Sequence, residues 1–588
     1  MKETAKESQA IERVLQGTAV SPGIGISPLH VVARGFSAPE VYAITDVEAE
    51  RTRFKDALAI TKIQLAELQK RIEAISGEEE SRIFEAHLMM LEDKAIVDRV
   101  NGAIAERKQN AEFALYAVAQ NFLEAMRRVP DPYLRERTAD IEDVCQRVLR
   151  NFSHEDQREG NPNGRHILVA YDLSPSDTAS MDRSHLMGFA TEVGSVNSHT
   201  AILARSLGIP AVVGLQGAVL DVRALTPAII DGYSGKLILN PSSETLAHYE
   251  QIRSEKERVR HQLEAQRHDE AITTDGHRIT LSANIELVKE LDYVKRSGAK
   301  GVGLYRTEFL LLEGEQIPGE DQQAEIYTEL ASSLAPDPVI IRTLDAGGDK
   351  LPIEPLTEPE PNPFLGWRGI RVSLDRPSMF KEQLRAILRA SAHGKVAVMF
   401  PLVSGIREVR MAKDLVKESM DELSAKKVPF DENIEIGVMI ELPSAAIIAD
   451  LIAPEVDFFS IGTNDLIQYT VAADRVNYRV ADLYRPTHPA VIRLIKRTID
   501  AAVDNGIWTG VCGEMAGDIR LTPLLLGLGV EELSVGPHQV PRVRHAIRAL
   551  SHVECQEMAT EAMRTPLSKD TLELTTELAL KYYPELID

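Results

Sequence analysis

The chain has 588 residues, of which 44% are hydrophobic and 26% are charged, and its formal net charge at pH 7 is -23. This length is too great for one hydrophobic core and predicts about three or four domains, and the negative charge argues against broad contact with nucleic acid or an anionic membrane. No apolar run reaches the ~18 residues of a membrane span, and the opening MKETAKESQ lacks a signal-peptide core. Three widely spaced cysteines form no metal pattern, so we expect a soluble cytoplasmic protein.

The first part of the chain predicts an α/β domain with a helical insertion. Residues up to about Gly17 form a polar leader with weak helical character, and a glycine-rich turn then leads into a strand at Leu29–Val32. Between about Asp46 and Asn151 glycine is scarce and apolar residues recur at spacings of three and four, which predicts a bundle of helices. Four helices are expected, within residues 54–68, 83–91, 113–126 and 141–148.

The stretch Val193–Gly214 predicts a turn, a helix with its body at Ala201–Leu207 and a strand at Ala211–Val213. Asn197 or Ser198 would cap this helix and Gly208 would end it. His199 then lies in the first helical turn, where unpaired N–H groups and the positive end of the helix dipole favour an anion such as a phosphoryl group. The spacing alone fits equally well a histidine that lies near a helix cap by chance.

Further strands are expected on both sides of this stretch. One is at His166–Ala170, and a strand–turn–strand unit spans Pro227–Asn240, where Asp-Gly and Ser-Gly mark the turn. Residues from about Pro241 to Arg267 are strongly charged and helix-forming with few large apolar side chains. We therefore expect an exposed connecting helix there.

The second half of the chain repeats short apolar segments that are mostly separated by helical patterns. Eight of them predict the strands of a (β/α)8 barrel, at residues 279–285, 301–309, 339–344, 396–401, 434–441, 458–463, 508–512 and 533–535. Polar residues end six of these segments: Asn284; Arg306 and Glu308; Arg342 and Asp345; Glu441; Asn464 and Asp465; Cys512 and Glu514. One such residue fits a surface cap, whereas six strands together favour a barrel active site.

The side chains at these strand ends indicate the ligand. Arg306, Arg342 and Arg475, with Arg368 as a further candidate, suit a molecule that carries both carboxylate and phosphate, because a guanidinium binds each with two hydrogen bonds.

Two carboxylates and a thiol complete the expected site. Glu441 and Asp465 end neighbouring strands and favour magnesium shared with a substrate phosphate, although ion pairs with the arginines are the alternative. A glycine after Cys512 and Glu514 beyond it favour an exposed thiol that donates a proton, and the alternative is a small buried side chain.

Five longer motifs identify a family. They are SHTAILAR (198–205), IRTLDAGGDK (341–350), NPFLGWR (362–368), SIGTNDLIQY (460–469) and VCGEMAGD (511–518). In order and spacing they resemble Enzyme I of the bacterial sugar phosphotransferase system, the phosphoenolpyruvate–protein phosphotransferase, from about Gly17 to Arg548. The resemblance implies that His199 takes the phosphoryl group from phosphoenolpyruvate and passes it to a histidine of the small carrier HPr.

The same resemblance implies roles in the barrel. Glu441 and Asp465 would hold Mg2+, and Cys512 would protonate the enolate to pyruvate. The substrate-binding residues would be Arg306, Arg342, Asn464, Asp465 and Arg475, with Arg368 and Lys350 as further candidates. The helical insertion would dock HPr, and the barrel would form a homodimer. The acidic run 78–80 is a candidate for part of the docking face, with a solvated helix end as the alternative.

The expected fold class is therefore multidomain α/β, with a C-terminal (β/α)8 barrel and an N-terminal phosphohistidine α/β domain that carries an inserted four-helix bundle. The expected domains are residues 1–40 with 155–245 (phosphohistidine), 41–154 (HPr-binding), 246–272 (linker helix) and 273–575 (phosphoenolpyruvate binding and dimerisation). We expect the phosphohistidine domain to swing between the barrel mouth and HPr about hinges at the ends of the linker helix.

The chain departs from the family pattern just before the histidine. The family usually has GGRTSH, and Ser195, Val196 and Asn197 replace its second glycine, arginine and threonine; Leu442 and Val476 also replace a common threonine and glycine. A regulatory protein that senses phosphoenolpyruvate and turns over slowly is therefore the alternative function. A pyruvate,phosphate dikinase or phosphoenolpyruvate synthase would need a nucleotide-binding domain, and we find no P-loop.

Overall fold

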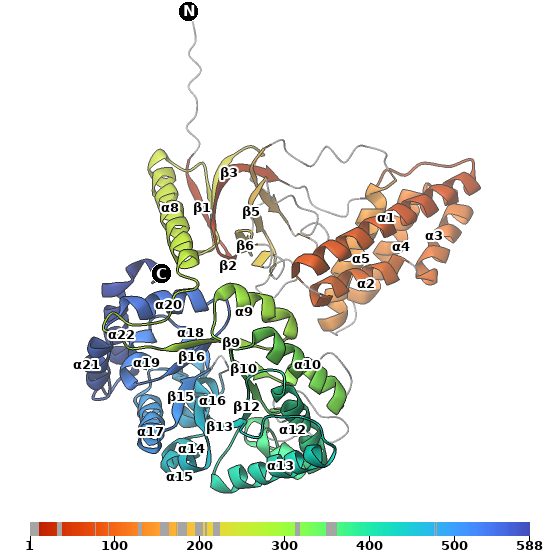
Figure 1. Ribbon diagram of the computed structural model, residues 1–588. Helices are drawn as coiled ribbons and strands as arrows, with labels where there is room; N and C mark the ends of the chain where they lie inside the picture. The colour runs from red at the N-terminus through yellow and green to blue at the C-terminus, as the bar shows by residue number, and fades with distance from the viewer. Residues whose placement is uncertain are drawn as a thin grey trace, which may run out of the picture. The chain divides into compact units, whose positions relative to one another are not determined.

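The computed structural model consists of two compact units, Met1–Glu255 and Lys256–Asp588. It describes residues 11–31, 38–76, 78–91, 93–127, 132–152, 164–171, 173, 185–194, 201, 204–205, 208–215, 224–311, 318–347, 362–475, 477 and 479–587. The boundary between the units falls inside α8 (Ser243–Ala265), which confirms the predicted charged helix (Figure 1). In the described residues, no helix has the length and apolar character that crossing a bilayer requires.

The first unit contains a mixed eight-stranded sheet in the order β1-β8-β7-β3-β4-β5-β6-β2. Its strands are β1 (Arg13–Gln16), β2 (Thr18–Ser21), β3 (Ile24–Val31), β4 (His166–Ala170), β5 (Leu186–Thr191), β6 (Ala211–Val213), β7 (Pro227–Asp231) and β8 (Lys236–Leu239). The run β3-β4-β5-β6 is parallel and the other neighbours are antiparallel. All of β4 is buried, as expected for a strand covered on both faces.

The end of the polar leader differs from the sequence prediction. Its last residues form β1 rather than a weak helix, because Arg13–Gln16 pairs antiparallel with Lys236–Leu239 at the sheet edge. The Gln16 side-chain amide also donates to the backbone oxygen of Ser234 at 2.9 Å. Pairing with a strand more than two hundred residues away overrides the local propensity.

The helical insertion has five helices rather than the predicted four: α1 (Val47–Ser76), α2 (Glu78–Leu91), α3 (Lys94–Arg107), α4 (Ala111–Arg127) and α5 (Pro132–Arg150). Figure 1 shows them side by side, and the prediction omitted α3. Val100 and Ile104 of α3 are fully buried in the bundle core. The helix was missed because Asn101-Gly102 interrupts an apolar stripe that Ile96 and Val97 begin.

The stretch around the predicted acceptor is described only in part. Strand β6 and the end of the helix before it are confirmed, because Gly208 has φ +63° and the N–H of Ile209 donates to the oxygen of Ala204 at 3.0 Å. Only a residue without a β-carbon adopts this backbone conformation at no cost. Residues 195–200, which include His199 and its expected cap, lie outside the described residues.

The second unit contains the predicted closed barrel of eight parallel strands. The strands are β9 (Thr280–Ile285), β10 (Val302–Arg306), β11 (Val339–Arg342), β12 (Val396–Phe400), β13 (Glu435–Ile440), β14 (Phe458–Ile461), β15 (Trp508–Val511) and β16 (Glu532–Val535). Strand β16 pairs with β9 and closes the barrel. All eight segments expected from the sequence are present.

Helices surround these strands (Figure 1). They are α9 (Leu291–Ser297), α10 (Glu320–Leu334), α11 (Ile370–Asp375), α12 (Pro377–Ser391), α13 (Ile406–Ala425), α14 (Pro443–Ile447), α15 (Ala449–Ile452), α16 (Thr463–Val471), α17 (Pro489–Asn505), α18 (Glu514–Gly517), α19 (Thr522–Leu528), α20 (Val540–Ala549), α21 (His552–Ala562) and α22 (Ser568–Tyr582). The main hydrophobic core lies between helices and strands.

The inside of the barrel holds a smaller apolar cluster that includes Leu304, Ile340, Met439 and Phe458. Successive strand residues point to opposite faces, so the residue two positions after each of these also points inward. This parity directs Arg306, Arg342 and Glu441 toward the barrel axis at the C-terminal mouth. The apolar layer beneath supports the polar layer above it.

A carboxyl group lies at the opposite, N-terminal end of the barrel interior. Glu532 is buried and accepts a hydrogen bond from the Ser282 hydroxyl at 2.5 Å. Gly510 leaves room for it, since a β-carbon there would lie 2.7 Å from a Glu532 carboxylate oxygen. Burial raises the pKa of Glu532 to about 7 from a usual value of 4.5, so the folded barrel favours the neutral acid.

This raised pKa predicts a pH-dependent stability. The unfolded chain loses the Glu532 proton near pH 4.5 and the folded chain keeps it until about pH 7, so stability falls as the pH rises between these values. Glu532→Gln keeps the acceptor for Ser282 and carries no charge. The unfolding free energy of this variant should be close to that of the wild type at pH 4.5 and exceed it by about 3 kcal/mol at pH 8 in denaturant unfolding. An equal difference at both pH values would contradict the prediction.

Candidate active site

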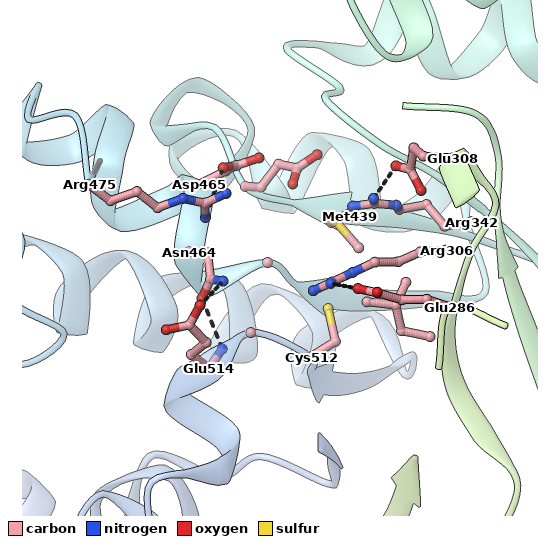
Figure 2. Close-up of a pocket in the computed structure, with 14 residues that line it drawn as sticks. Glu286, Arg306, Glu308, Arg342, Met439, Asn464, Asp465, Arg475, Cys512 and Glu514 are labelled. Atoms are coloured by element: carbon pink, nitrogen blue, oxygen red, sulfur yellow. Dashed lines mark hydrogen bonds and ion pairs between the residues drawn. The ribbon is translucent and has the colours of Figure 1, made fainter. Parts of the chain in front are cut away.

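A cavity of about 340 Å³ opens at the C-terminal mouth of the barrel. It is lined by Glu286, Leu304, Arg306, Glu308, Arg342, Met439, Glu441, Gly462, Asn464, Asp465, Arg475, Cys512, Gly513 and Glu514 (Figure 2). Nine of the residues singled out in the sequence are therefore brought together: Arg306, Glu308, Arg342, Glu441, Asn464, Asp465, Arg475, Cys512 and Glu514. Lys350, like His199, lies outside the described residues.

Arg368 does not line this cavity. Its buried guanidinium donates to Asp345 and to Asp465, each at 3.0 Å, and to the Tyr469 hydroxyl at 3.3 Å. The structure thus places Arg368 behind Asp465, where it orients that carboxylate. Direct contact of Arg368 with a substrate stays a prediction.

Arg342 forms the most buried ion pair of the cavity. It donates to Glu308, and the two side chains are only 6% and 7% exposed. A second carboxylate, Asp345, lies 3.6 Å from Arg342. Because water cannot screen these charges, the pair holds the guanidinium in one place.

Removal of Glu308 should therefore be costly. Glu308→Ala leaves the buried Arg342 guanidinium with the more distant Asp345 as its ion-pair partner. We therefore expect a loss of about 3 kcal/mol in the unfolding free energy of the barrel. Glu308→Gln keeps an acceptor and should lose less. Chemical denaturation monitored by circular dichroism measures both, and a loss for Glu308→Ala below about 1 kcal/mol would contradict the expectation.

Two other arginines are paired closer to solvent. Arg306 donates to Glu286, and these side chains are 34% and 35% exposed. Arg475 lies 3.8 Å from Asp465 and is 34% exposed. Figure 2 shows Arg306, Arg342 and Arg475 directed toward the same space, so one ligand with two anionic groups can reach more than one guanidinium.

Asn464 and Glu514 bind one another at the rim of the cavity. The Asn464 amide donates to a Glu514 carboxylate oxygen at 3.0 Å, and the Glu514 N–H donates to the Asn464 amide oxygen at 2.9 Å. This close approach of the β14 and β15 loops requires glycine at 513, because a β-carbon there would lie 1.9 Å from the Thr463 hydroxyl oxygen.

The two predicted metal ligands have different surroundings. Glu441 is buried and accepts the Leu402 N–H at 2.5 Å, and Leu402 has a strained left-handed backbone with φ +53°. Burial, together with the negative charges of Asp465 and Asp345, raises the pKa of Glu441 to about 7. In the described residues, no group of three or more His, Cys, Asp or Glu side chains suits a metal ion. Glu441 and Asp465 are a pair of hard oxygen ligands.

The thiol of Cys512 lies inside the cavity wall rather than on an exposed surface. Cys512 is 2% exposed, and its sulfur is 3.7 Å from the backbone oxygen of Ile461. Burial raises its pKa to about 11, so the thiol keeps its proton at neutral pH. A protonated thiol in a cavity can act as a general acid but not as a strong nucleophile.

Asn284, which ends the first barrel strand, has a structural contact instead of a place in the cavity. Its amide donates to the backbone oxygens of Cys512 and Ser534, each at 2.9 Å. It thereby ties β9 to the ends of β15 and β16. The sequence analysis did not single out Glu286, although its place directly after a barrel strand was a usable signal.

Three protein-family models match the chain. Residues 260–552 match the PEP-binding domain of PEP-utilising enzymes, residues 16–137 their N-terminal domain and residues 162–235 their mobile domain. A phosphoenolpyruvate-protein phosphotransferase of Staphylococcus carnosus is 41% identical over 565 residues, which cover 96% of this chain and 98% of the relative. One from Listeria innocua is 42% identical over 575 residues, which cover 97% and 99%.

This chain belongs to the phosphoenolpyruvate-protein phosphotransferase family. The family predicted from the five motifs is confirmed, and with it the enzyme class, a transferase. Every residue that lines the cavity falls within the range that matches the PEP-binding domain. His199 falls within the range that matches the mobile domain.

Proposed function

We propose that this phosphotransferase moves the phosphoryl group of phosphoenolpyruvate to His199 and then to a histidine of an HPr-type carrier, releasing pyruvate, as the first step of sugar uptake by the phosphotransferase system. The observation that carries the proposal is the single cavity where three guanidiniums, two metal-suited carboxylates and a protonated thiol meet. The near full-length relatives support it.

The substrate would be held by its two anionic groups. Arg306, Arg342 and Arg475 offer guanidiniums that bind phosphate and carboxylate oxygens, and Asn464 offers an amide donor at the rim. Because phosphoryl transfer depends on orientation and charge neutralisation, fixed positive groups contribute most to the rate.

Glu441 and Asp465 would hold Mg2+. The donor set fits, because burial and the negative charge of Asp465 raise the pKa of Glu441, and a cation bound between two such hard oxygen ligands would favour the charged carboxylate. A bound magnesium would supply positive charge to the substrate phosphate. Arg368, hydrogen-bonded to both Asp345 and Asp465, would keep the Asp465 carboxylate directed at the cavity.

The chemistry needs one nucleophile and one acid. An imidazole nitrogen of neutral His199 attacks phosphorus, the N–P bond forms and the enol O–P bond breaks, which leaves the enolate of pyruvate. Cys512 then gives its proton to the terminal carbon of the enolate, and solvent returns a proton to the thiolate. The phosphoryl group passes from His199 to the carrier histidine by a second displacement.

The acceptor and the substrate cavity belong to different units, with His199 in Met1–Glu255 and the cavity in Lys256–Asp588. We therefore propose four parts of the chain. They are the phosphohistidine domain (residues 1–40 with 155–245), the HPr-binding domain (41–154), the linker helix (246–272) and the barrel domain (273–575). The phosphohistidine domain would move as a body, with hinges near the ends of α8. An engineered disulfide that locks the phosphohistidine domain to the barrel should stop one of the two half-reactions.

The helical insertion would dock the carrier. On α1 and α2, Ile63 is 62% exposed and Met89 is 72% exposed, and the acidic Glu67 and Glu85 are also exposed. Apolar side chains with acidic neighbours suit a partner that presents a basic rim around an apolar patch. The side chains of the acidic run 78–80 lie outside the described ones, so their part in docking stays a prediction.

The barrel would form the homodimer. Ile447 on α14 and Leu451 on α15 are 52% and 56% exposed and lie four residues apart, so they offer apolar area for a second copy. A cytoplasmic location fits the three free, buried cysteines. The dimer is tested by measuring the molecular mass in sedimentation at micromolar concentration, for the unaltered protein and for Leu451→Glu.

The function is tested by incubating the purified protein with phosphoenolpyruvate that carries labelled phosphorus, with Mg2+ and with or without HPr. We expect label on His199, located by mass spectrometry under alkaline conditions, and its transfer when HPr is added. If label never reaches His199, the proposal is wrong. The same experiment distinguishes the phosphotransferase from the alternative function, a regulatory phosphoenolpyruvate sensor. Such a sensor would be labelled but would pass the label to HPr only slowly.

A further inference from the structure

The pair of Glu286 and Arg306 lies where a substrate anion would bind. Glu286 directly follows β9 and Arg306 ends β10, and the parallel register aligns Ile285 with Tyr305. The next residue of each strand therefore lies beside the other at the mouth. Both line the cavity, and Figure 2 shows their charged groups in contact.

The backbone around Glu286 is fixed. The N–H groups of Glu286 and Leu287 both donate to one Glu290 carboxylate oxygen, at 2.8 and 2.9 Å. This turn closes the β9–α9 connection and leaves the Glu286 side chain directed at the cavity. The hydrogen bonds hold the backbone of Glu286, while its carboxylate is held by Arg306 and is 35% exposed.

The degree of burial separates this pair from the other arginine pair at the mouth. Arg342 and Glu308 are 6% and 7% exposed, so breaking their contact would leave a buried charge without its ion-pair partner. Arg306 and Glu286 are 34% and 35% exposed, and water can solvate the carboxylate once it leaves. Of these two pairs, the one with Glu286 is the one an incoming anion can open at small cost.

We propose that Glu286 is a positioning residue that competes with the substrate for Arg306. Its carboxylate holds the guanidinium in place and gives way when an anionic group of the substrate binds. When the product leaves, Glu286 returns to Arg306 and opposes rebinding. This inference rests on the proposed function, since it takes Arg306 as a substrate-binding residue.

Such competition lowers the affinity for every anion that needs Arg306. Glu286→Gln removes the charge and keeps the size of the side chain, so Arg306 becomes available without displacement. The KM for phosphoenolpyruvate should fall about threefold to tenfold, the range of a partly exposed ion pair, while kcat changes less than about twofold. Inorganic phosphate, added as a competitive inhibitor, should bind more tightly by a similar factor.

Two matched variants test whether the effect comes from Arg306. Asp292 is an exposed residue in the first turn of α9, so Asp292→Asn removes the same charge from the same end of the barrel and should leave KM unchanged. Glu286→Gln introduced into Arg306→Gln should have no further effect on affinity, because the residue for which Glu286 competes is gone. Calorimetric titration with phosphoenolpyruvate and Mg2+, with every protein carrying His199→Ala so that no phosphoryl transfer follows binding, measures affinity in the otherwise unaltered protein and in the four variants.

The outcomes separate this inference from the proposed function. If Arg306→Gln weakens binding and Glu286→Gln leaves it unchanged or weaker, the competition is wrong and the substrate site stands. An equal gain from Asp292→Asn would also overturn it, since that result assigns the effect to net charge. If Arg306→Gln itself leaves affinity unchanged, the proposed substrate site is wrong.

Discussion

Replacing His199 with alanine should abolish phosphoryl transfer to the carrier while phosphoenolpyruvate still binds. His199 lies in Met1–Glu255 and the residues that line the cavity lie in Lys256–Asp588, so the acceptor is lost without a change in the substrate cavity. Because alanine offers no nucleophile, transfer should fall by at least about 10⁴-fold, and the dissociation constant of phosphoenolpyruvate should stay within about twofold.

The measurements are label transfer to HPr and calorimetric titration with phosphoenolpyruvate and Mg2+. His185→Ala is the matched control, since it removes an exposed histidine of the same unit and should leave transfer intact. Residual transfer above about one per cent of the wild-type rate would assign the acceptor to another residue.

Replacing Cys512 with alanine should slow the formation of pyruvate by about 10²–10⁴-fold, the range of a general acid. Burial raises the pKa of this thiol to about 11, so nearly every Cys512 carries a transferable proton at pH 7. Alanine is smaller by one sulfur atom and preserves the neutral cavity wall. Phosphoenolpyruvate affinity should therefore change little, and the loss should appear in kcat.

A coupled lactate dehydrogenase assay follows pyruvate directly. Cys555→Ala is the control, because Cys555 is equally buried but packs in the helical core around α21 rather than in the cavity. We expect a near normal rate for that variant. A Cys512→Ala enzyme that keeps more than about half of its kcat would show that the proton comes from elsewhere.

The sequence predicts the barrel well because two independent patterns coincide there. Apolar segments of strand length mark the eight strands, and inward parity places Arg306, Arg342 and Glu441 two residues beyond Leu304, Ile340 and Met439. Both patterns involve residues close together in the sequence, so they can be recognised before the three-dimensional structure is known. The same is true of β6, whose preceding helix ends at a glycine with positive φ.

Features that depend on distant residues were missed or only partly foreseen. Strand β1 exists because β8 pairs with it, and the α3 helix is stabilised by burial in the bundle rather than by a strong stripe of its own. The position of Arg368 behind Asp465 also depends on contacts that span 97 residues. The position of Glu286 at a strand end could be read from the sequence, whereas its pairing with Arg306 depends on the register between β9 and β10.

The hydrogen bonds of Asn284 link the proposed proton donor, Cys512, to the closure of the barrel. Its amide joins the first barrel strand to the backbone of Cys512 and to the last strand, across separations of 228 and 250 residues. Contacts between such distant parts of a chain form late, because loop closure must precede them. In a partly closed barrel, the backbone of Cys512, the proposed proton donor, would lack the hydrogen bond from Asn284.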